Sequence, residues 1–207
     1  MSYLHYMLYL VFTDERYTQI LYKIILLCYF IMIKIRNAKP EDVKDITNVF
    51  YQAYIITYPN DIIDVSKEDI YELFKDAYSE SKLIAMADHI KNIPSNCKYM
   101  VATDGENIIG LCKIFNKENF NQLQSIYVLP SYQGQGIGRM FWSEALKFFD
   151  KNKKIIVQVA TYNEKAIKFY ESLGFKDNEK RFSEEKHRMP ISKVLIPEME
   201  MEVNFPI

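Results

Sequence analysis

The spacing of hydrophobic and polar residues changes several times along this chain of 207 residues, and each change predicts a new element. Alternating apolar positions predict strands, and apolar residues three or four positions apart predict helices. Strands are expected at 33–36, 98–103, 107–115, 123–129, 154–160, from 175 onward and at 194–203, and helices at 40–58, 66–93, 140–149 and 163–173. This order, with two helices before the second strand, predicts one mixed α/β domain.

Turn and capping residues support these boundaries. Asp104-Gly105 lies between two alternating segments and is typical of a β-hairpin. Pro40 and the Ser66–Asp69 capping box are typical of helix starts. Gly174 follows the last helical segment, where a left-handed residue commonly ends a helix.

The stretch from Leu123 to Arg139 contains three glycines on alternate positions between a strand and a helix. They are Gly134, Gly136 and Gly138. Glycines at such a place let backbone N–H groups turn toward an anion, which the positive end of the helix also attracts. The pattern predicts a site for a phosphorylated ligand, although a turn that only connects the two elements would fit the same residues.

Two common phosphate-binding motifs do not match this stretch. A dinucleotide fingerprint needs G-x-G-x-x-G and an acid at the end of the next strand. Here the glycines follow G-x-G-x-G, and the next strand ends in Ala160-Thr161-Tyr162-Asn163. A P-loop is excluded as well, because no Gly-Lys-Ser/Thr follows the glycines.

Composition narrows the classes of function. A hydrophobic content of 49% and a charged content of 26% are typical of a globular protein, and a net charge of −1 gives no reason to expect nucleic acid. Cys28, Cys97 and Cys112 are far apart, as are the histidines. We therefore expect reduced core cysteines, a cytoplasmic location and no metal site.

The N-terminal segment is the most apolar part of the chain. Its run from Ile20 to Ile33 contains Lys23, is shorter than the about 20 residues that a membrane-spanning helix needs, and lacks the pattern of a signal peptide. Met32 begins a segment typical of a domain start. We therefore expect an N-terminal extension at 1–31 and a domain at 32–207, with no membrane anchor.

Two segments in a fixed order carry a resemblance to a known family. They are YVLPSYQGQGIGR and, after the next strand, NEKAIKFYESLGF. Together they resemble the GNAT superfamily of acyl-CoA-dependent N-acetyltransferases, most clearly from Leu123 to Phe175. The resemblance implies a mixed, mostly antiparallel α/β sheet with helices on both faces and a splayed strand pair that binds acetyl-CoA. It also implies that the domain at 32–207 transfers acetyl directly to a primary amine, without a metal.

The same resemblance assigns roles to single residues. The glycine loop, which we define as residues 133–138, would hold the cofactor pyrophosphate through backbone N–H groups. The strand Ile126–Val128 would pair with the pantetheine amides. Asn163 would bind the pantetheine or keep the strands apart, and it also suits the N-cap of its helix. The expected cofactor-binding residues are Ile126, Tyr127, Val128, Gln133, Gly134, Gln135, Gly136, Ile137, Gly138, Arg139 and Asn163.

Tyr170 is the expected catalytic residue. In the resembled family the tyrosine at this position lies near the CoA sulfur, where it can donate a proton as the thiolate leaves. A tyrosine that only packs on its helix is the alternative. No general base is evident, because Gln122, Gln124 and Gln158 stand where the family can place a carboxylate. Water, or a carboxylate elsewhere, would then serve; the candidates are Glu41, Asp61 and Glu200.

The acceptor is expected between the first two helices and the last pair of strands. Tyr54, Tyr58 and Asp61 are the candidate substrate-binding residues, because aromatic faces and carboxylates select a cationic amine. A small amine such as a polyamine and the α-amino group of a protein N-terminus both fit. A catalytically silent acyl-CoA-binding module that regulates a partner is the alternative function. Family habit suggests a homodimer, and no nucleic-acid or membrane partner is expected.

Overall fold

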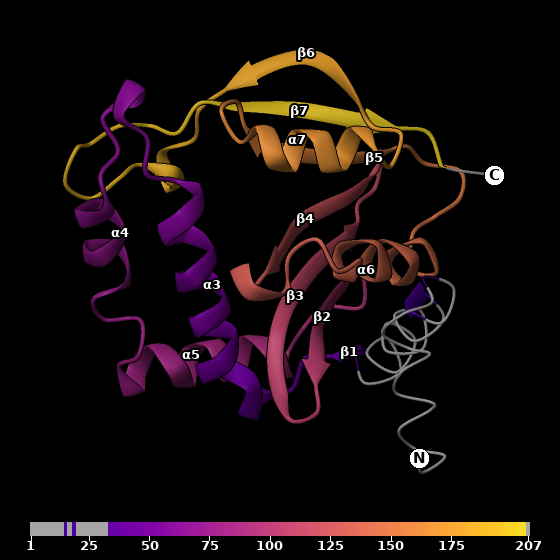
Figure 1. Ribbon diagram of the computed structural model, residues 1–207, viewed down its shortest axis with the longest axis horizontal. Helices are drawn as coiled ribbons and strands as arrows, with labels where there is room; N and C mark the ends of the chain where they lie inside the picture. Colours follow the sequence, from indigo (N-terminus) through magenta and orange to yellow (C-terminus); the bar gives the residue numbers. More distant parts are fainter. Residues whose placement is uncertain (1–14, 16–17, 20–32, 206–207) are drawn as a thin grey trace.

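A seven-stranded sheet runs through the part of the chain that the structure describes (Figure 1). The structure is a computed structural model, and the described residues are 15, 18, 19 and 33–205. The expected extension at 1–31 and the apolar run from Ile20 therefore lie outside the described residues, apart from these few positions. The strand order is β1-β2-β3-β4-β5-β7-β6. All neighbouring pairs are antiparallel except β4 and β5, which are parallel. This confirms the predicted mixed, mostly antiparallel sheet.

The strands agree with the predicted positions to within a few residues. They are β1 (Ile33–Asn37), β2 (Cys97–Asp104), β3 (Asn107–Asn116), β4 (Asn121–Val128), β5 (Ile155–Ala160), β6 (Lys176–Phe182) and β7 (Glu198–Val203). The hairpin at Gly105 and the left-handed turn at Gly174 are both present, with φ of 58° and 93°.

The helices differ most from the prediction at one place, and the helix expected at 140–149 lies three residues earlier, at Ile137–Leu146. They are α3 (Val43–Thr57), α4 (Lys67–Phe74), α5 (Glu80–Lys91), α6 (Ile137–Leu146) and α7 (Glu164–Glu171), with short 3-10 turns at η1 (Pro40–Asp42), η2 (Asp61–Ile63), η3 (Pro130–Tyr132) and η4 (Glu185–His187). The single helix expected at 66–93 is wrong, because Ser79 has an extended backbone and begins a new helix after α4 ends. None of the helices in the described residues is long and apolar enough to span a membrane.

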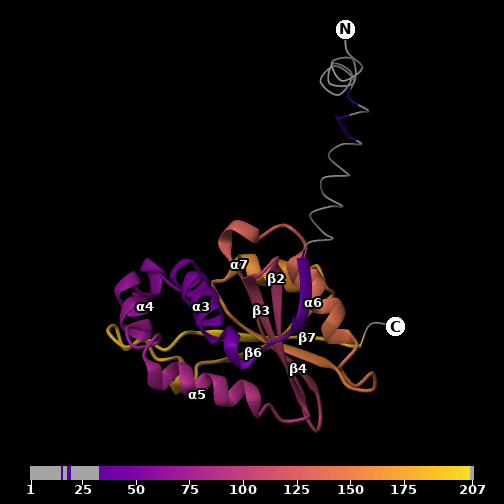
Figure 2. The ribbon, with the colours of Figure 1, turned by 90° about the horizontal axis from the view of Figure 1, so that it is seen from below.

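Helices cover both faces of the sheet (Figure 2). On one face, Phe141 of α6 and Tyr170 of α7 join the core cluster that contains the buried, free Cys112. On the other face, Ile46 and Val49 of α3 pack with α5 against β2 and β3. The two apolar layers hold the central strands in place and leave the carboxyl ends of β4 and β5 between α3 and α7 (Figure 1).

The parallel pair β4 and β5 separates after a short contact. Their pairing runs only from Asn121 opposite Ile155 to Leu123 opposite Val157. Immediately after it, the register between β3 and β4 shifts so that Gln124 is an extra residue on β4. A bulge of this kind bends a strand and increases its twist. The rest of β4, to Val128, therefore diverges from β5 and leaves a wedge in the sheet.

A buried carboxylate fastens α4 to the loop before β7. Asp69 is 0% exposed and accepts hydrogen bonds from the backbone N–H groups of Ile191 (2.8 Å), Ser192 (2.9 Å) and Ser66 (3.2 Å). Burial raises the pKa of Asp69, but the N–H donors outweigh it and bring the pKa below its usual value. The loop is thereby fixed beside α4 and the end of α3 (Figure 1).

We expect Asp69→Ala to lower the free energy of unfolding by about 2–3 kcal/mol at pH 7, because it leaves buried N–H donors without a hydrogen-bond acceptor. Since the folded-state pKa lies below the unfolded value, this stabilisation is present above a pH of about 4 and declines as the pH falls through the folded-state pKa. Urea unfolding followed by circular dichroism at pH 7 and at about pH 3 measures both effects. Glu68→Ala, an exposed acid in the same first turn, is the control and should change stability by less than about 0.5 kcal/mol. Equal stability of the two variants at pH 7 would contradict this assignment.

Candidate active site

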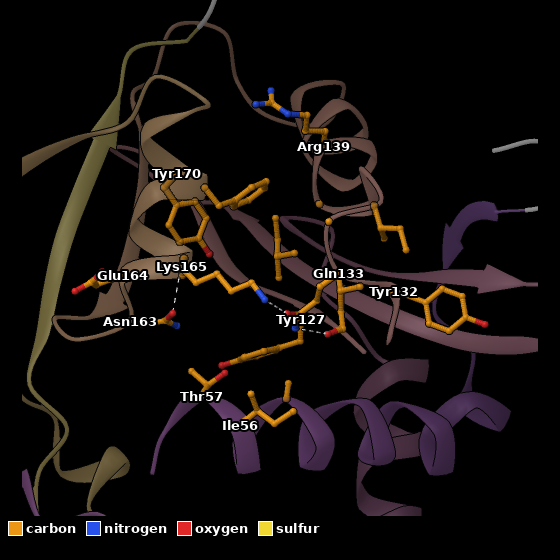
Figure 3. Close-up of a pocket in the computed structure, with 18 of the residues that line it drawn as sticks. Ile56, Thr57, Tyr127, Tyr132, Gln133, Arg139, Asn163, Glu164, Lys165 and Tyr170 are labelled. Atoms are coloured by element: carbon orange, nitrogen blue, oxygen red, sulfur yellow. Dashed lines mark hydrogen bonds between the residues drawn. The ribbon is translucent and has the colours of Figure 1, made fainter. Parts of the chain in front are cut away.

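A cleft of about 680 Å³ opens where β4 and β5 separate (Figure 3). Its walls come from β4, the glycine loop, α7 and the end of α3. It is lined by ten of the eleven expected cofactor residues, namely Ile126, Tyr127, Val128, Gln133, Gly134, Gly136, Ile137, Gly138, Arg139 and Asn163, and by Tyr170. The predicted cofactor residues and the predicted catalytic residue are therefore brought to one cleft.

The glycine loop has the backbone conformation that its sequence indicates. Gly134 and Gly136 have φ of 80° and 83°, in the left-handed region. Gly136 is the N-cap of α6, so the N–H groups of the first helical turn, which have no partner within the helix, lie beside the cleft. This end of the helix carries partial positive charge and suits an anion.

Gly138 has a different role, which is close packing. A Cβ atom at this position would lie 2.8 Å from Cζ of Phe169, so the absent side chain lets α6 and α7 approach each other. Phe169 also lines the cleft. The spacing of the cleft walls thus depends on this contact.

We expect Gly138→Ala to lower the free energy of unfolding by about 1–3 kcal/mol through overpacking against Phe169. Thermal unfolding measures the loss. The double variant Gly138→Ala/Phe169→Leu provides space for the new methyl group and should recover part of the stability. A double variant no more stable than Gly138→Ala would show that the contact is not the cause.

A lysine that the sequence analysis did not select reaches across the cleft. Lys165 Nζ donates to Oε1 of Gln133, and Nε2 of Gln133 donates to the carbonyl oxygen of Val128 at 3.0 Å (Figure 3). A cation in the first turn of a helix is unfavourable, because that end of the helix dipole is positive. This position of Lys165 is the feature of the sequence that could have identified it as a functional residue. Arg139 also lines the cleft, while its guanidinium donates to Oγ of Ser172 at 2.9 Å.

Asn163 serves as the N-cap of α7. Its Oδ1 accepts the backbone N–H of Ala166 at 3.1 Å (Figure 3). The side chain thus fixes where α7 begins at the edge of the cleft. Gln135 does not line the cleft; its Nε2 donates to the carbonyl oxygen of Ser131 at 2.9 Å.

The hydroxyl of Tyr170 points from α7 toward the cleft (Figure 3). The residue is only 6% exposed, and none of the described residues forms a hydrogen bond with its hydroxyl. Burial raises the pKa of Tyr170 above its usual value, and the nearby Cys112 adds to the effect. The side chain therefore carries its proton at neutral pH and is available as a donor.

The expected acceptor residues lie outside the cleft lining. Tyr54 and Tyr58 pack with Tyr127, with ring centroids 5.6 Å apart for Tyr54 and Tyr127 and hydroxyl oxygens 3.2 Å apart for Tyr58 and Tyr127. They contact the cleft through Tyr127, whose ring lies between the cleft and α3 (Figure 3). Asp61 is exposed in η2 and is not among the lining residues.

The residues considered for a general base are also absent from the cleft lining within the described part of the chain. They are the carboxylates Glu41, Asp61 and Glu200; Gln122, Gln124 and Gln158, which stand where the family can place a carboxylate, do not line the cleft either. Oε1 of Glu200 accepts a hydrogen bond from Nζ of Lys180 at 2.8 Å, and Oε1 of Glu41 lies 3.8 Å from Nζ of Lys39. Among the described residues there is also no group of three or more His, Cys, Asp or Glu side chains able to hold a metal.

Known proteins share this sequence pattern and fold. The sequence profile of the Acetyltransferase (GNAT) family matches residues 67–175 of this chain. An uncharacterized N-acetyltransferase of Archaeoglobus fulgidus is 27% identical over 142 residues, which cover 68% of this chain and 90% of that protein.

Two solved structures show the same fold at low sequence identity. The PaiA N-acetyltransferase of Thermoplasma acidophilum, solved with coenzyme A, has a TM-score of 0.63 and 21% identity, with 84% of this chain and 99% of that chain covered. A mutant of the spermidine N-acetyltransferase SpeG of Vibrio cholerae has a TM-score of 0.53 and 23% identity, with 83% and 93% covered. With the family profile spanning more than half of its length, this chain belongs to the GNAT family of N-acetyltransferases.

Proposed function

We propose that this protein transfers the acetyl group of acetyl-CoA directly to a primary amine. One observation carries the proposal: the same cleft contains the diverging edge of β4, the left-handed glycine loop at the start of α6 and the hydroxyl of Tyr170. The glycine loop suits a diphosphate, the edge of β4 suits the amides of an extended arm, and the hydroxyl of Tyr170 suits a leaving thiolate.

The residues present fit acetyl-CoA. From Gln124 to Val128, β4 is not paired with β5, so its backbone can pair with the amides of a pantetheine arm, as an added strand would. The glycine loop and the first turn of α6 would hold the diphosphate, with Arg139 and Lys165 as the cations that line the cleft. When bound, the thioester supplies an acetyl group activated toward nucleophiles.

Tyr170 acts as the proton donor in this proposal. Its raised pKa keeps the hydroxyl protonated, so the side chain can deliver a proton to a sulfur atom that becomes negatively charged. Burial between α7 and the core also strengthens a hydrogen bond from this hydroxyl, because little water competes for it.

The acceptor is proposed to enter from the side of α3. Tyr54, Tyr58 and Tyr127 form an aromatic group there, and aromatic faces attract a cationic amine. Asp61 is left as an exposed charge that could attract the same cation before it binds. A small amine such as a polyamine and the α-amino group of a protein N-terminus are the two acceptor classes.

The test is an acceptor panel. The full chain is mixed with acetyl-CoA and either polyamines or short peptides with free N-termini, and release of CoA thiol and the mass of the product are followed. Acetylated product from one class supports the proposal and identifies the acceptor. Tight CoA binding by calorimetry without product from any acceptor would favour the alternative, a catalytically silent acyl-CoA-binding module.

The catalytic domain is proposed to be residues 32–207, because the strands and helices from Ile33 to Val203 build the sheet and the cleft. We expect a chain without residues 1–31 to keep its kcat within about twofold, since the described residues already supply the cleft. Steady-state rates of the two chains measure this.

We further propose a cytoplasmic enzyme, in keeping with the free thiols of Cys97 and Cys112, and a homodimer.

A further inference from the structure

We propose that His187 and Glu198 form the pair that accepts a proton from the acceptor amine. This inference rests on the proposed function and on the nearness of Glu198 to Tyr162, which lines the cleft; His187 and Glu198 themselves are not among the lining residues. Of the two residues, His187 would take the proton, and Glu198 would orient and stabilise it.

The two side chains are in direct contact. Nδ1 of His187 lies 2.7 Å from Oε2 of Glu198. The Glu198 side chain is 10% exposed and the His187 side chain 33% exposed, so the carboxylate is buried and the imidazole reaches solvent. With Nδ1 occupied by the carboxylate, Nε2 is the free lone pair, and no described residue forms a hydrogen bond with it. A carboxylate on one ring nitrogen and an open second nitrogen is the arrangement of a histidine base.

The sheet places Glu198 of this pair at the end of β5, the strand that borders the wedge. Glu198 lies opposite Ala160, the last residue of β5, and the N–H of Thr161 donates to the carbonyl oxygen of Pro197 at 2.9 Å. The following residue, Tyr162, lines the cleft, and its hydroxyl donates to the carbonyl oxygen of Tyr58 at 3.2 Å. Glu198 therefore lies beside the end of β5, two residues before the point where Tyr162 lines the cleft.

Electrostatics agrees with this proximity. Burial raises the pKa values of Tyr54, Tyr58 and Tyr162, and the negative charge of Glu198 raises each of them further. A charge that acts on all three hydroxyls lies near the side from which the acceptor is proposed to enter. The same negative charge attracts an ammonium group.

Glu198 also differs from the other acids of its strand. Glu198, Glu200 and Glu202 share one face of β7. Lys180 binds Glu200 and Lys154 binds Glu202, each at 2.8 Å. Among the described residues, Glu198 has a histidine partner and no lysine or arginine within ion-pair distance. It is the acid of this row whose charge is not already balanced by a lysine.

The proton balance is simple. A primary ammonium group gives one proton to Nε2 of His187 and becomes a neutral amine with a free electron pair. This electron pair of the nitrogen forms the new C–N bond to the acetyl carbon while the C–S bond breaks. The nitrogen then loses its second proton, which replaces the one that Tyr170 gives to the sulfur, and His187 returns its proton to water. The overall products are the amide, the thiol and one proton.

Several other titratable groups surround the pair and enter any pH profile. They are Tyr54 of α3 and Tyr58 just after it, Tyr162 after β5, Lys180 of β6 with Glu200 of β7, and Glu184, Glu185, Lys186 and Arg188 near η4. The tyrosines have raised pKa values and remain protonated. Lys180 is held charged by Glu200, with a raised pKa.

The test compares kcat/KM as a function of pH for three variants, with an amine that the acceptor panel identifies. Without a base, only the neutral fraction of the amine reacts, which for a pKa of about 10.4 is roughly one part in a thousand near neutral pH. With a polyamine, His187→Gln should therefore lose about 100-fold in kcat/KM at pH 7 and recover about tenfold per pH unit up to pH 9; with an α-amino group, whose pKa is about 8, the loss at pH 7 should be about tenfold. Glu198→Gln should lose about tenfold, since the amide still holds Nδ1 but no longer stabilises the imidazolium. Glu202→Gln is the control and should match the wild type.

The outcomes separate this inference from the proposed function. Turnover by the wild type with no loss in His187→Gln, or with a loss that does not shrink at high pH, overturns the base and leaves the acetyltransferase intact. A rise in KM for the amine at constant kcat also overturns it, because that result indicates binding alone. In each variant the calorimetric Kd for CoA should stay within about twofold of the wild type.

A second measurement needs no turnover. Spermidine, added to the full chain with CoA bound, is expected to shift the imidazole resonances of His187 in an NMR titration. Glu202→Gln should retain the shift, and Glu198→Gln should reduce it. Unchanged resonances at saturating spermidine and at a saturating N-terminal peptide would overturn the placement of the amine at this pair.

Discussion

Replacing Tyr170 with phenylalanine should lower kcat about 100- to 1000-fold and leave the Kd for CoA within about twofold. The variant removes one hydroxyl and keeps the ring, so the packing of α7 on the core is retained. What is lost is the proton donor in the cleft, and general acid catalysis contributes about 10²- to 10⁴-fold in enzymes. Thiol release gives kcat, and calorimetry with CoA gives the Kd.

Tyr132→Phe is the matched control for this experiment. Tyr132 also lines the cleft, but its hydroxyl donates to Asp104 at 3.1 Å, on the far side of the glycine loop (Figure 3). Its kcat should change less than about threefold. Because the pKa of Tyr170 is raised, the wild-type rate should show no decline that depends on this residue below a pH of about 10. Wild-type kcat in Tyr170→Phe would rule out the proton-donor role.

Gly136→Ala should weaken CoA binding by about 30- to 100-fold. A side chain at φ of 83° costs about 1–2 kcal/mol, and the loop can relieve this strain by rotating its N–H groups away from the ligand. Each hydrogen bond to a charged group that is lost in this way costs about 1.5–3 kcal/mol. Calorimetry of the variant with CoA measures the change.

Gly105→Ala controls for the strain itself. Gly105 has φ of 58° and lies at the tip of the β2–β3 hairpin, where a Cβ atom would meet no other atom within 4 Å. Both variants should lose similar stability, but only Gly136→Ala should lose affinity for CoA. Equal affinities in the two variants would show that the glycine loop does not hold the diphosphate.

For residues close together in the sequence, the sequence indicated which of them lie together in the structure. Nine of the ten expected cofactor residues that line the cleft lie there because the strand, the glycine loop and α6 follow each other directly in the chain; the tenth, Asn163, comes from the start of α7. Local chemistry also identified the hairpin at Gly105 and the N-cap at Asn163. The break before α5 was missed, because Ser79 interrupts a helical pattern that otherwise continues.

Residues brought together by the sheet could not be predicted in the same way. His187 and Glu198 meet each other across a loop, and Glu198 lies near Tyr162 only because β7 pairs with β5 in a particular register. A shift of one residue would turn Glu198 to the other face. Asp61 was selected for its charge and its neighbours in sequence, and its exposed position depends on the η2 turn, where Asn60 accepts the N–H of Ile62.

The short contact between β4 and β5 also has a mechanical consequence. It joins one half of the sheet, β1 to β4, to the other half, β5 to β7, through three residue pairs. A ligand that pairs with the edge of β4 would extend this short connection and hold the two halves of the sheet more firmly together. Binding would then stiffen strands far from any ligand contact, so that occupancy of the cleft and the rigidity of the whole sheet rise together.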